Sequence, residues 1–373
     1  MRREATAAFG ASRLLVLAVA LLAAEFGIDS TGEANEAKFD DPSLTHPFDG
    51  VADALLSPLA RWDATWYLDI SGDGYDGGLD AAFFPLYPLL VRALVLPFAS
   101  EGALLVSAYV VSLACFACAL WLLHRLVELE AGRSVATAAV WLIALFPAAV
   151  YFGAPYSESL FLLASVGAFY AARTDHWAVA GMAAAAAGAT RSAGLVMLVA
   201  LVLLWFDSRR RRPADLAWLA LAPLGLAAYA LYLGLEHGDA LAFLDAQDAW
   251  YREFAGPFVG AWDGAVAAWE GATIDAVLFG FLVFAVVAVI GTFRRLPLAY
   301  GSYALAALAL PLSFPVDPQP LMSLPRFVAV LFPLFIWLAL VTEERARTVP
   351  LAAASAVGLA VFTERFATWE WIA

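Results

Sequence analysis

Residues 103–123 read ALLVSAYVVSLACFACALWLL, a run of apolar and small residues without a single charge. A helix needs roughly 20 such residues to cross the hydrocarbon core of a bilayer. Similar runs lie at 9–26, 214–235 and 274–293. Because backbone polar groups in lipid must be hydrogen-bonded within the protein, repeated runs of this kind predict an all-α integral membrane protein.

The composition agrees with a membrane protein. Hydrophobic residues make up 63% of the 373 residues, whereas soluble domains contain about half. The net charge is −13, and Lys38 is the single lysine. An acidic chain repels nucleic acid, so we expect membrane lipid and not nucleic acid as a partner. The acidic, lysine-poor surface favours a high-salt environment and a prokaryotic, haloarchaeal source.

Basic residues in short loops mark the cytoplasmic side of a membrane protein. Placing Arg2 and Arg3 inside brings every later basic cluster to the same side if the chain crosses the membrane about eleven times. This predicts a multi-pass protein of the cell membrane with a cytoplasmic N-terminus and an outer C-terminal end, where Trp369 and Trp371 lie at the interface. The predicted spans are 9–26, 102–124, 134–152, 156–172, 176–190, 192–206, 214–235, 273–293, 297–313, 326–342 and 348–364.

Two segments decide whether this scheme holds. No small-residue cleavage motif precedes Asp29, so we expect the N-terminal run to be a retained helix and not a cleaved signal peptide. Segment 81–98 is apolar enough to span, but prolines and Arg92 interrupt it. We expect a re-entrant or interfacial helix there, because a further span would turn the block Arg209–Arg212 outward.

Two long loops of this single polytopic domain, 1–373, fall on the outer side: 29–80 and 236–272. Long loops often carry binding and catalytic residues. The first holds twelve acidic residues against two basic ones, Lys38 and Arg61. We therefore expect the functional site on the outer face.

Within the first outer loop, 57–71 has the signals of a short helix that Gly72 ends. Trp62 and Trp66 are four residues apart and share a face, and indole rings favour the membrane interface. The helix should therefore lie along the bilayer surface. An acid beside lipid is costly unless it is used, which favours a functional role for Asp63. The alternative is a solvated aspartate on an aromatic interfacial helix.

Residues 61–75 read RWDATWYLDISGDGY, and 82–89 read AFFPLYPL. This pair resembles the motifs R-W-D-x-x-H/W-[FY]-L-x-I-A-x-x-G-Y and A-F-F-P-x-[YF]-P of the PIG-V family of mannosyltransferases, with Ser71 where the family commonly has alanine. Later segments are also similar to the family: the YSESLF block that contains Glu158, RSAG at 191–194 (alanine replacing the usual asparagine), and PRF at 325–327.

This resemblance implies a GT-C type bundle that moves mannose from a polyprenyl (dolichyl) phosphate carrier to a glycan acceptor on a glycolipid or glycoprotein. It implies that Asp63 is the catalytic base. Arg191 and Arg326 are the expected phosphate contacts, and Glu158 is either a sugar or acceptor contact or the partner of an arginine. The remaining expected substrate-binding residues are Arg61, Trp62, Trp66 and Tyr156.

Several alternatives stay open. Arg191 and Arg326 fit snorkelling at the membrane edge, and Glu158 fits a favourable charge at a helix N-terminus. Asp73 and Asp76 are candidates for a divalent cation, or simply solvated acids; no other cofactor is indicated. The rival functions are a transporter or flippase for a lipid-linked substrate and a GT-C transferase of another sugar. Charges gathered at one face argue against a transporter, whose charges lie at mid-depth.

Overall fold

The computed structural model describes residues 3–27, 30–97, 100–271 and 273–372. The described part is mainly helical and contains no strand, and its single β-type contact is an isolated bridge between Arg252 and Val316. This confirms the all-α prediction. Four residues at the edges of predicted segments lie outside the described residues: Arg2, Asp29, Phe98 and Ala272.

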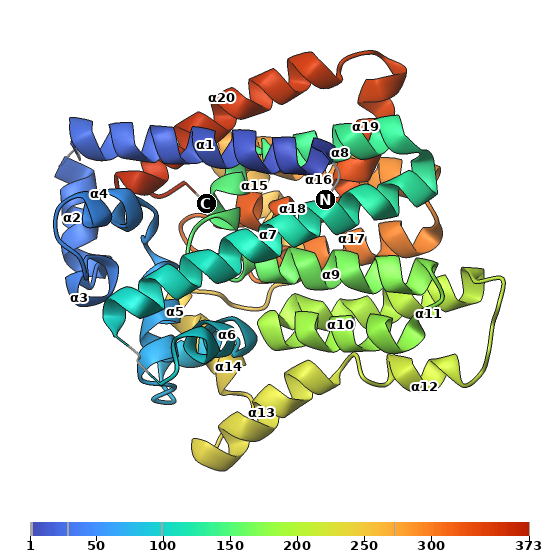
Figure 1. Ribbon diagram of the computed structural model, residues 1–373, viewed down its shortest axis with the longest axis horizontal. Coiled ribbons are helices and arrows are strands. Elements are labelled where there is room, and N and C mark those ends of the chain that lie inside the picture. The colour runs from blue at the N-terminus through green and yellow to red at the C-terminus, as the bar shows by residue number, and fades with distance from the viewer. Residues whose placement is uncertain (1–2, 28–29, 98–99, 272, 373) are drawn as a thin grey trace.

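The bundle consists mainly of long and medium helices, with the short α12 between α11 and α13 (Figure 1). They are α1 (Arg3–Phe26), α7 (Glu101–Ala131), α8 (Arg133–Ala144), α9 (Glu158–Arg173), α10 (Trp177–Thr190), α11 (Met197–Asp207), α12 (Asp215–Leu219), α13 (Leu224–Glu236), α16 (Thr273–Arg295), α17 (Leu298–Leu312), α19 (Phe332–Glu344) and α20 (Thr348–Ala367).

Shorter elements fill the two long loops and the breaks between bundle helices. The first loop holds α2 (Ser30–Phe39), α3 (Pro42–Thr45), α4 (Val51–Leu56), η1 (Ser57–Leu59), α5 (Asp63–Gly72) and η2 (Leu79–Ala82), and α6 (Leu86–Val95) follows. The second holds α14 (Ala242–Asp245), η5 (Ala246–Trp250) and α15 (Pro257–Glu270). The breaks hold η3 (Pro147–Phe152), η4 (Ser192–Val196) and α18 (Leu324–Ala329).

Every predicted span overlaps at least one helix, and several apolar helices make this a multi-pass membrane protein by length and composition. In the described part, α1, α7, α16 and α20 are long and apolar enough to cross a membrane. The spans predicted at 134–152, 192–206, 214–235 and 326–342 are each broken into two helical pieces. Prolines account for most of these breaks, because proline cannot donate the next helical hydrogen bond.

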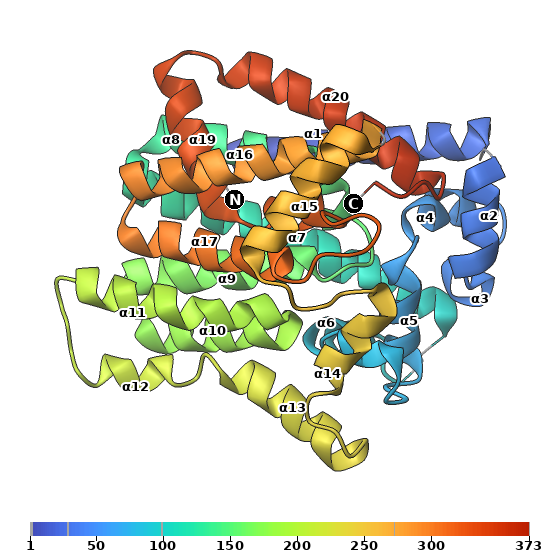
Figure 2. The same ribbon diagram turned by 180° about the vertical axis from the view of Figure 1, so that it is seen from behind.

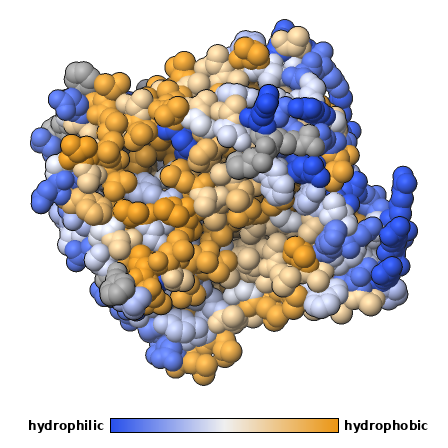
Figure 3. Space-filling model, in the orientation of Figure 1, coloured by the Kyte–Doolittle hydropathy of each residue, from blue (hydrophilic) through white to orange (hydrophobic). Residues whose placement is uncertain are grey.

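The helices run side by side, with α7 packed against α1, α8 and α9 (Figure 1). Seen from behind, α15 lies across α16 and α17, which it contacts (Figure 2). In the orientation of Figure 1, hydrophobic residues form a band between two hydrophilic edges (Figure 3). The helices therefore cross this band, and their ends meet its two edges.

Several basic loop residues form ion pairs with neighbouring helices at one end of the bundle. Arg133 pairs with Glu4 and so joins α8 to α1. Arg173 of α9 binds Glu130 at 2.5 Å and Asp207 at 2.7 Å. Arg295 of α16 binds Glu344 of α19 at 2.6 Å. The loops that the charge rule assigned to one side thus lie together, and the first long loop lies at the opposite end (Figure 1).

The first long loop departs from prediction at its central helix. A continuous helix over 57–71 is wrong: η1 ends at Leu59, and α5 begins only at Asp63. Between them Trp62 takes a left-handed backbone angle, φ 57°, which is uncommon for a residue with a side chain. The chain therefore turns sharply just before Asp63.

Helix α6, in the segment predicted as re-entrant or interfacial, has 10 residues and ends at Val95. At about 1.5 Å per residue it is too short to cross a bilayer core of about 30 Å. Tyr87 and Val91 are buried on one face, while Leu89 and Leu94 are exposed on the other. Its re-entrant or interfacial position remains a prediction.

The C-terminal tail also departs from prediction. Trp369 is fully buried, not placed at an interface, and its indole nitrogen donates to Glu36 at 3.2 Å. The rings of Trp369 and Trp371 pack against Trp62, with centroids 5.3 and 4.9 Å away. The tail thus returns to the first loop and encloses the turn before Asp63.

Candidate active site

Asp63 is the first residue of α5, directly after the turn at Trp62. The hydroxyl of Tyr156 accepts a hydrogen bond from the Asp63 amide at 3.0 Å and donates one to the Arg61 carbonyl at 2.9 Å. One side chain therefore fixes the backbone on both sides of the turn. The helix N-terminus carries partial positive charge, so it is a favourable position for an acidic side chain.

Four charged side chains, distant in the sequence, form a continuous chain of ion pairs. Arg326 Nη1 lies 2.5 Å from Asp63 Oδ2, and Arg326 Nε lies 2.6 Å from Glu158 Oε1. Arg191 Nη2 lies 3.0 Å from the same Glu158 oxygen. Glu158 is fully buried, and burying a carboxylate is costly without such partners. The structure thus places Glu158 as the shared partner of two arginines.

These residues are positioned where helices begin or break. Glu158 starts α9 after the break at η3. Arg191 has an extended backbone conformation and lies between α10 and η4. Arg326 belongs to the six-residue helix α18, which a turn separates from α19. In membrane proteins, irregular backbone is tolerated where it lines a cavity.

A cavity of about 280 Å³ opens beside this chain of ion pairs. Its polar wall contains Asp63, Arg191, Arg252 and Arg326. Aromatic rings supply much of the remaining wall: Phe83, Phe84, Phe161, Phe243, Phe314 and Phe327. A carboxylate, several guanidinium groups and an apolar surface therefore meet in one place.

Several residues expected to bind substrate do not line this cavity. Tyr156 is 1% exposed and supports the backbone of Asp63. Trp62 is enclosed by Phe39, Trp369 and Trp371. Trp66 stacks on Phe83, which does line the cavity, with ring centroids 5.6 Å apart. Glu158 lies behind Arg191 and Arg326.

Arg61 also points away from the cavity, into a separate cluster of the first loop. Its Nη1 lies 3.2 Å from His46 Nε2 and 3.8 Å from Glu36, and its guanidinium stacks on Trp369 at 5.0 Å. Burial lowers the pKa of Arg61, while Asp40 and Glu36 act in the opposite direction. In this arrangement, Arg61 therefore does not make the direct contact with substrate that was expected of it.

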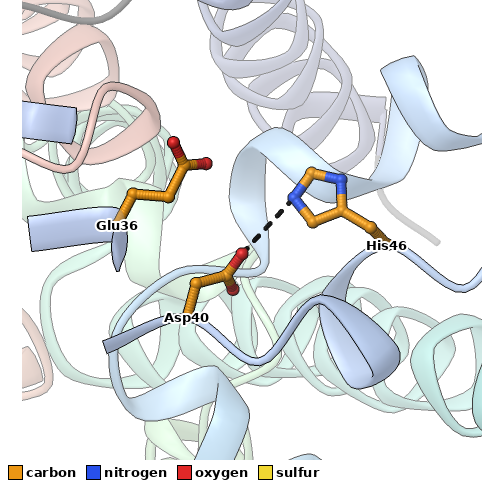
Figure 4. Close-up of side chains that lie close together, drawn as sticks. All are labelled: Glu36, Asp40 and His46. Atoms are coloured by element: carbon orange, nitrogen blue, oxygen red, sulfur yellow. Dashed lines mark ion pairs between the residues drawn. The ribbon is translucent and has the colours of Figure 1, made fainter. Parts of the chain in front are cut away.

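The metal candidates Asp73 and Asp76 are both exposed. In the described part of the chain, the one group with ligand atoms within 4.8 Å of one another is Glu36, Asp40 and His46 (Figure 4). The guanidinium of Arg61 already contacts two of its members, and a resident cation there competes with a metal ion. We therefore assign no metal to either place.

Sequence reasoning missed Arg252, which lines the cavity from the second loop, and Trp371, which lines it from the C-terminal tail. One signal pointed to Arg252: it is a basic residue in a loop predicted to lie outside, where the charge rule predicts few basic residues. No pattern pointed to Trp371, because its place depends on how the tail folds back.

Comparison with known proteins gives one family and several related sequences. A family model described as Mannosyltransferase (PIG-V) matches residues 2–211. GPI alpha-1,6-mannosyltransferase 2 of Mus musculus is 34% identical over 159 residues, which are 40% of this chain and 32% of that protein. GPI mannosyltransferase 2 of Drosophila melanogaster is 28% identical over 166 residues, 42% and 36% of the two chains. The matched region thus spans about a third of these relatives.

Solved structures give weaker similarities. The oligosaccharyltransferase of Archaeoglobus fulgidus in the apo form is 12% identical with a TM-score of 0.48, covering 96% of this chain and 56% of that one. The archaeal oligosaccharyltransferase from the same organism, in complex with an inhibitory peptide and a dolichol-phosphate, is 14% identical with a TM-score of 0.46, covering 78% and 48%.

Proposed function

The chain belongs to the mannosyltransferase (PIG-V) family, and on that premise we propose that it moves mannose from a polyprenyl (dolichyl) phosphate carrier to a hydroxyl group of a glycolipid or glycoprotein glycan. The observation that carries the proposal is the meeting of Asp63 with Arg191, Arg252 and Arg326 around one cavity. A lipid-phosphate sugar donor needs a base, cations and an apolar wall together, and this cavity supplies all three.

In the proposed reaction Asp63 accepts the proton of the acceptor hydroxyl as the hydroxyl oxygen attacks the anomeric carbon of mannose. The bond between that carbon and the phosphate oxygen breaks, and its electron pair leaves with the polyprenyl phosphate. A single displacement of this kind inverts the anomeric configuration. Asp63 Oδ2 is bound by Arg326, and among the described residues no hydrogen bond to Oδ1 is recorded, so Oδ1 is the oxygen we assign to the proton.

The arginines stabilise the negative charge of the departing phosphate. Negative charge grows on the phosphate oxygens as the sugar leaves, and fixed guanidinium groups stabilise such charge without having to reorganise. The aromatic wall suits the first isoprene units of the carrier. Since the site lies at the end opposite the basic loops, the charge rule favours transfer on the outer side of the membrane, with the N-terminus inside.

A transfer assay tests the donor. The full chain in lipid nanodiscs receives dolichyl phosphate mannose, dolichyl phosphate glucose or a nucleotide-activated mannose, each labelled in the sugar, with a membrane glycolipid extract as acceptor. We expect label to reach the acceptor from dolichyl phosphate mannose alone. Transfer from glucose or from the nucleotide sugar contradicts the proposed donor. Movement of labelled lipid across the bilayer without any transfer supports the transporter alternative.

A further inference from the structure

Three guanidinium groups surround one aromatic ring of the cavity. The Cζ atoms of Arg191, Arg252 and Arg326 lie 5.4, 5.7 and 5.9 Å from the ring centroid of Phe327. They reach it from the end of α10, from the second loop and from α18. Like charges brought together in partly buried surroundings repel, so each of them requires a compensating anion.

The carboxylates of Asp63 and Glu158 compensate only two of the three arginines. Arg326 binds both Asp63 and Glu158, and Arg191 binds Glu158. Within the described ranges, no carboxylate lies at ion-pair distance from Arg252. Its Nη1 lies 3.4 Å from the carbonyl oxygen of Phe314, at the long end of hydrogen-bond distances. One positive charge is therefore in excess, and it resides on Arg252.

Arg252 is also held in place before any ligand arrives. Its backbone forms an antiparallel bridge with Val316, and the amides of Ala255 and Gly256 donate to the Ser313 carbonyl at 2.9 and 3.2 Å. The side chain is half-buried, and this burial lowers the pKa of the guanidinium to about 10, so it stays charged at neutral pH. A fixed charge that has no carboxylate partner among the described residues is suited to an anionic ligand.

We propose that Arg252 is the principal phosphate-binding residue of this cavity, and that its ligand is the phosphate of a polyprenyl-phosphate sugar and then of the polyprenyl phosphate product. The identity of the lipid rests on the proposed function; the phosphate itself rests on the excess charge. Arg191 and Arg326 have carboxylate partners, so they hold Glu158 and Asp63 in position. Either arginine contacts the phosphate only while it also binds its carboxylate. The product carries one more ionisable oxygen than the donor, so Arg252 favours the charge that develops during transfer.

Binding of the product, without turnover, tests the assignment. The full chain in nanodiscs is titrated with dolichyl phosphate, with dolichol of equal length and with inorganic phosphate, and tryptophan fluorescence reports binding because Trp371 lines the cavity. The variants are Arg252→Gln and Arg252→Lys. The matched control is Arg210→Gln, which removes one exposed positive charge from the α11–α12 connection. Thermal unfolding of each variant verifies that the fold is retained.

We expect Arg252→Gln to weaken dolichyl phosphate binding about tenfold or more, Arg252→Lys to weaken it less, and Arg210→Gln to leave it unchanged. Dolichol binding should not respond to either Arg252 variant. Dolichyl phosphate bound equally well by folded Arg252→Gln, or not bound by the unaltered chain, overturns the assignment. Tight binding of inorganic phosphate alone overturns the lipid as its source. Arg252-dependent binding without mannose transfer supports the assignment while contradicting the proposed function, so the two fail separately.

Discussion

Arg326 binds the carboxylate of Asp63 at 2.5 Å although 263 residues separate the two in the chain. The same guanidinium binds the buried carboxylate of Glu158 at 2.6 Å. The first loop, the start of α9 and α18 are therefore joined through one side chain. An ion pair enclosed in this way is weak evidence for a gain in stability, but removal of one partner leaves the other charge buried and uncompensated.

Arg326→Gln is therefore expected to lower the free energy of unfolding by about 3–5 kcal/mol and to abolish most mannose transfer. Arg326→Lys keeps the charge but loses the fork that reaches both carboxylates, so it should recover only part of the stability. Thermal unfolding and transfer rates of the two variants measure this. Unchanged stability and rate in Arg326→Gln contradict the linking role.

Tyr156→Phe removes the hydroxyl that joins the Asp63 amide to the Arg61 carbonyl. Because both groups then lose a buried hydrogen bond, we expect destabilisation of about 1–3 kcal/mol. Transfer should slow through kcat, with the KM for donor nearly unchanged, since Tyr156 does not line the cavity. Tyr232→Phe is the control, because Tyr232 is exposed. A raised KM with normal kcat would instead indicate direct contact with substrate.

Asp80 gives a pH dependence outside the membrane-spanning helices. Burial raises the pKa of this carboxyl, while the Asp76 amide that donates to Asp80 Oδ2 at 2.6 Å lowers it in part. The folded protein then holds the proton more tightly than the unfolded chain, so stability falls as pH rises from the unfolded pKa through the folded one. The difference in unfolding free energy between the unaltered chain and Asp80→Asn should decline over that interval. A difference that is constant with pH contradicts the assignment.

The sequence predicted the main features of the site because they follow from local rules. Basic loops placed the segments of Asp63, Glu158, Arg191 and Arg326 at one end of the helices, and the structure brings these four side chains together. The resemblance to the PIG-V motifs singled out the same residues. The topology predicted only that these residues share one side; which helix ends meet, and so which ion pairs form, came from the structure.

The remaining features depend on tertiary contacts that no local rule contains. The signals at Ser57 predicted a helix through Asp63, but the rings of Trp369 and Trp371 stabilise a left-handed Trp62 and break it. Those rings come from a tail whose tryptophans suggested only an interface. Arg252 follows no motif, and its place depends on an isolated bridge to Val316. Each of these was missed because the partner lies far away in the chain.

The most direct measurement of the central claim is kcat for mannose transfer from dolichyl phosphate mannose by Asp63→Asn, compared with Asp49→Asn, an exposed aspartate of the same loop. If Asp63 is the base, kcat falls by about 100-fold or more in Asp63→Asn. Dolichyl phosphate binding should persist in that variant, and Asp49→Asn should match the unaltered chain. Normal transfer by Asp63→Asn, with both variants folded, would contradict the assignment of Asp63 as the base.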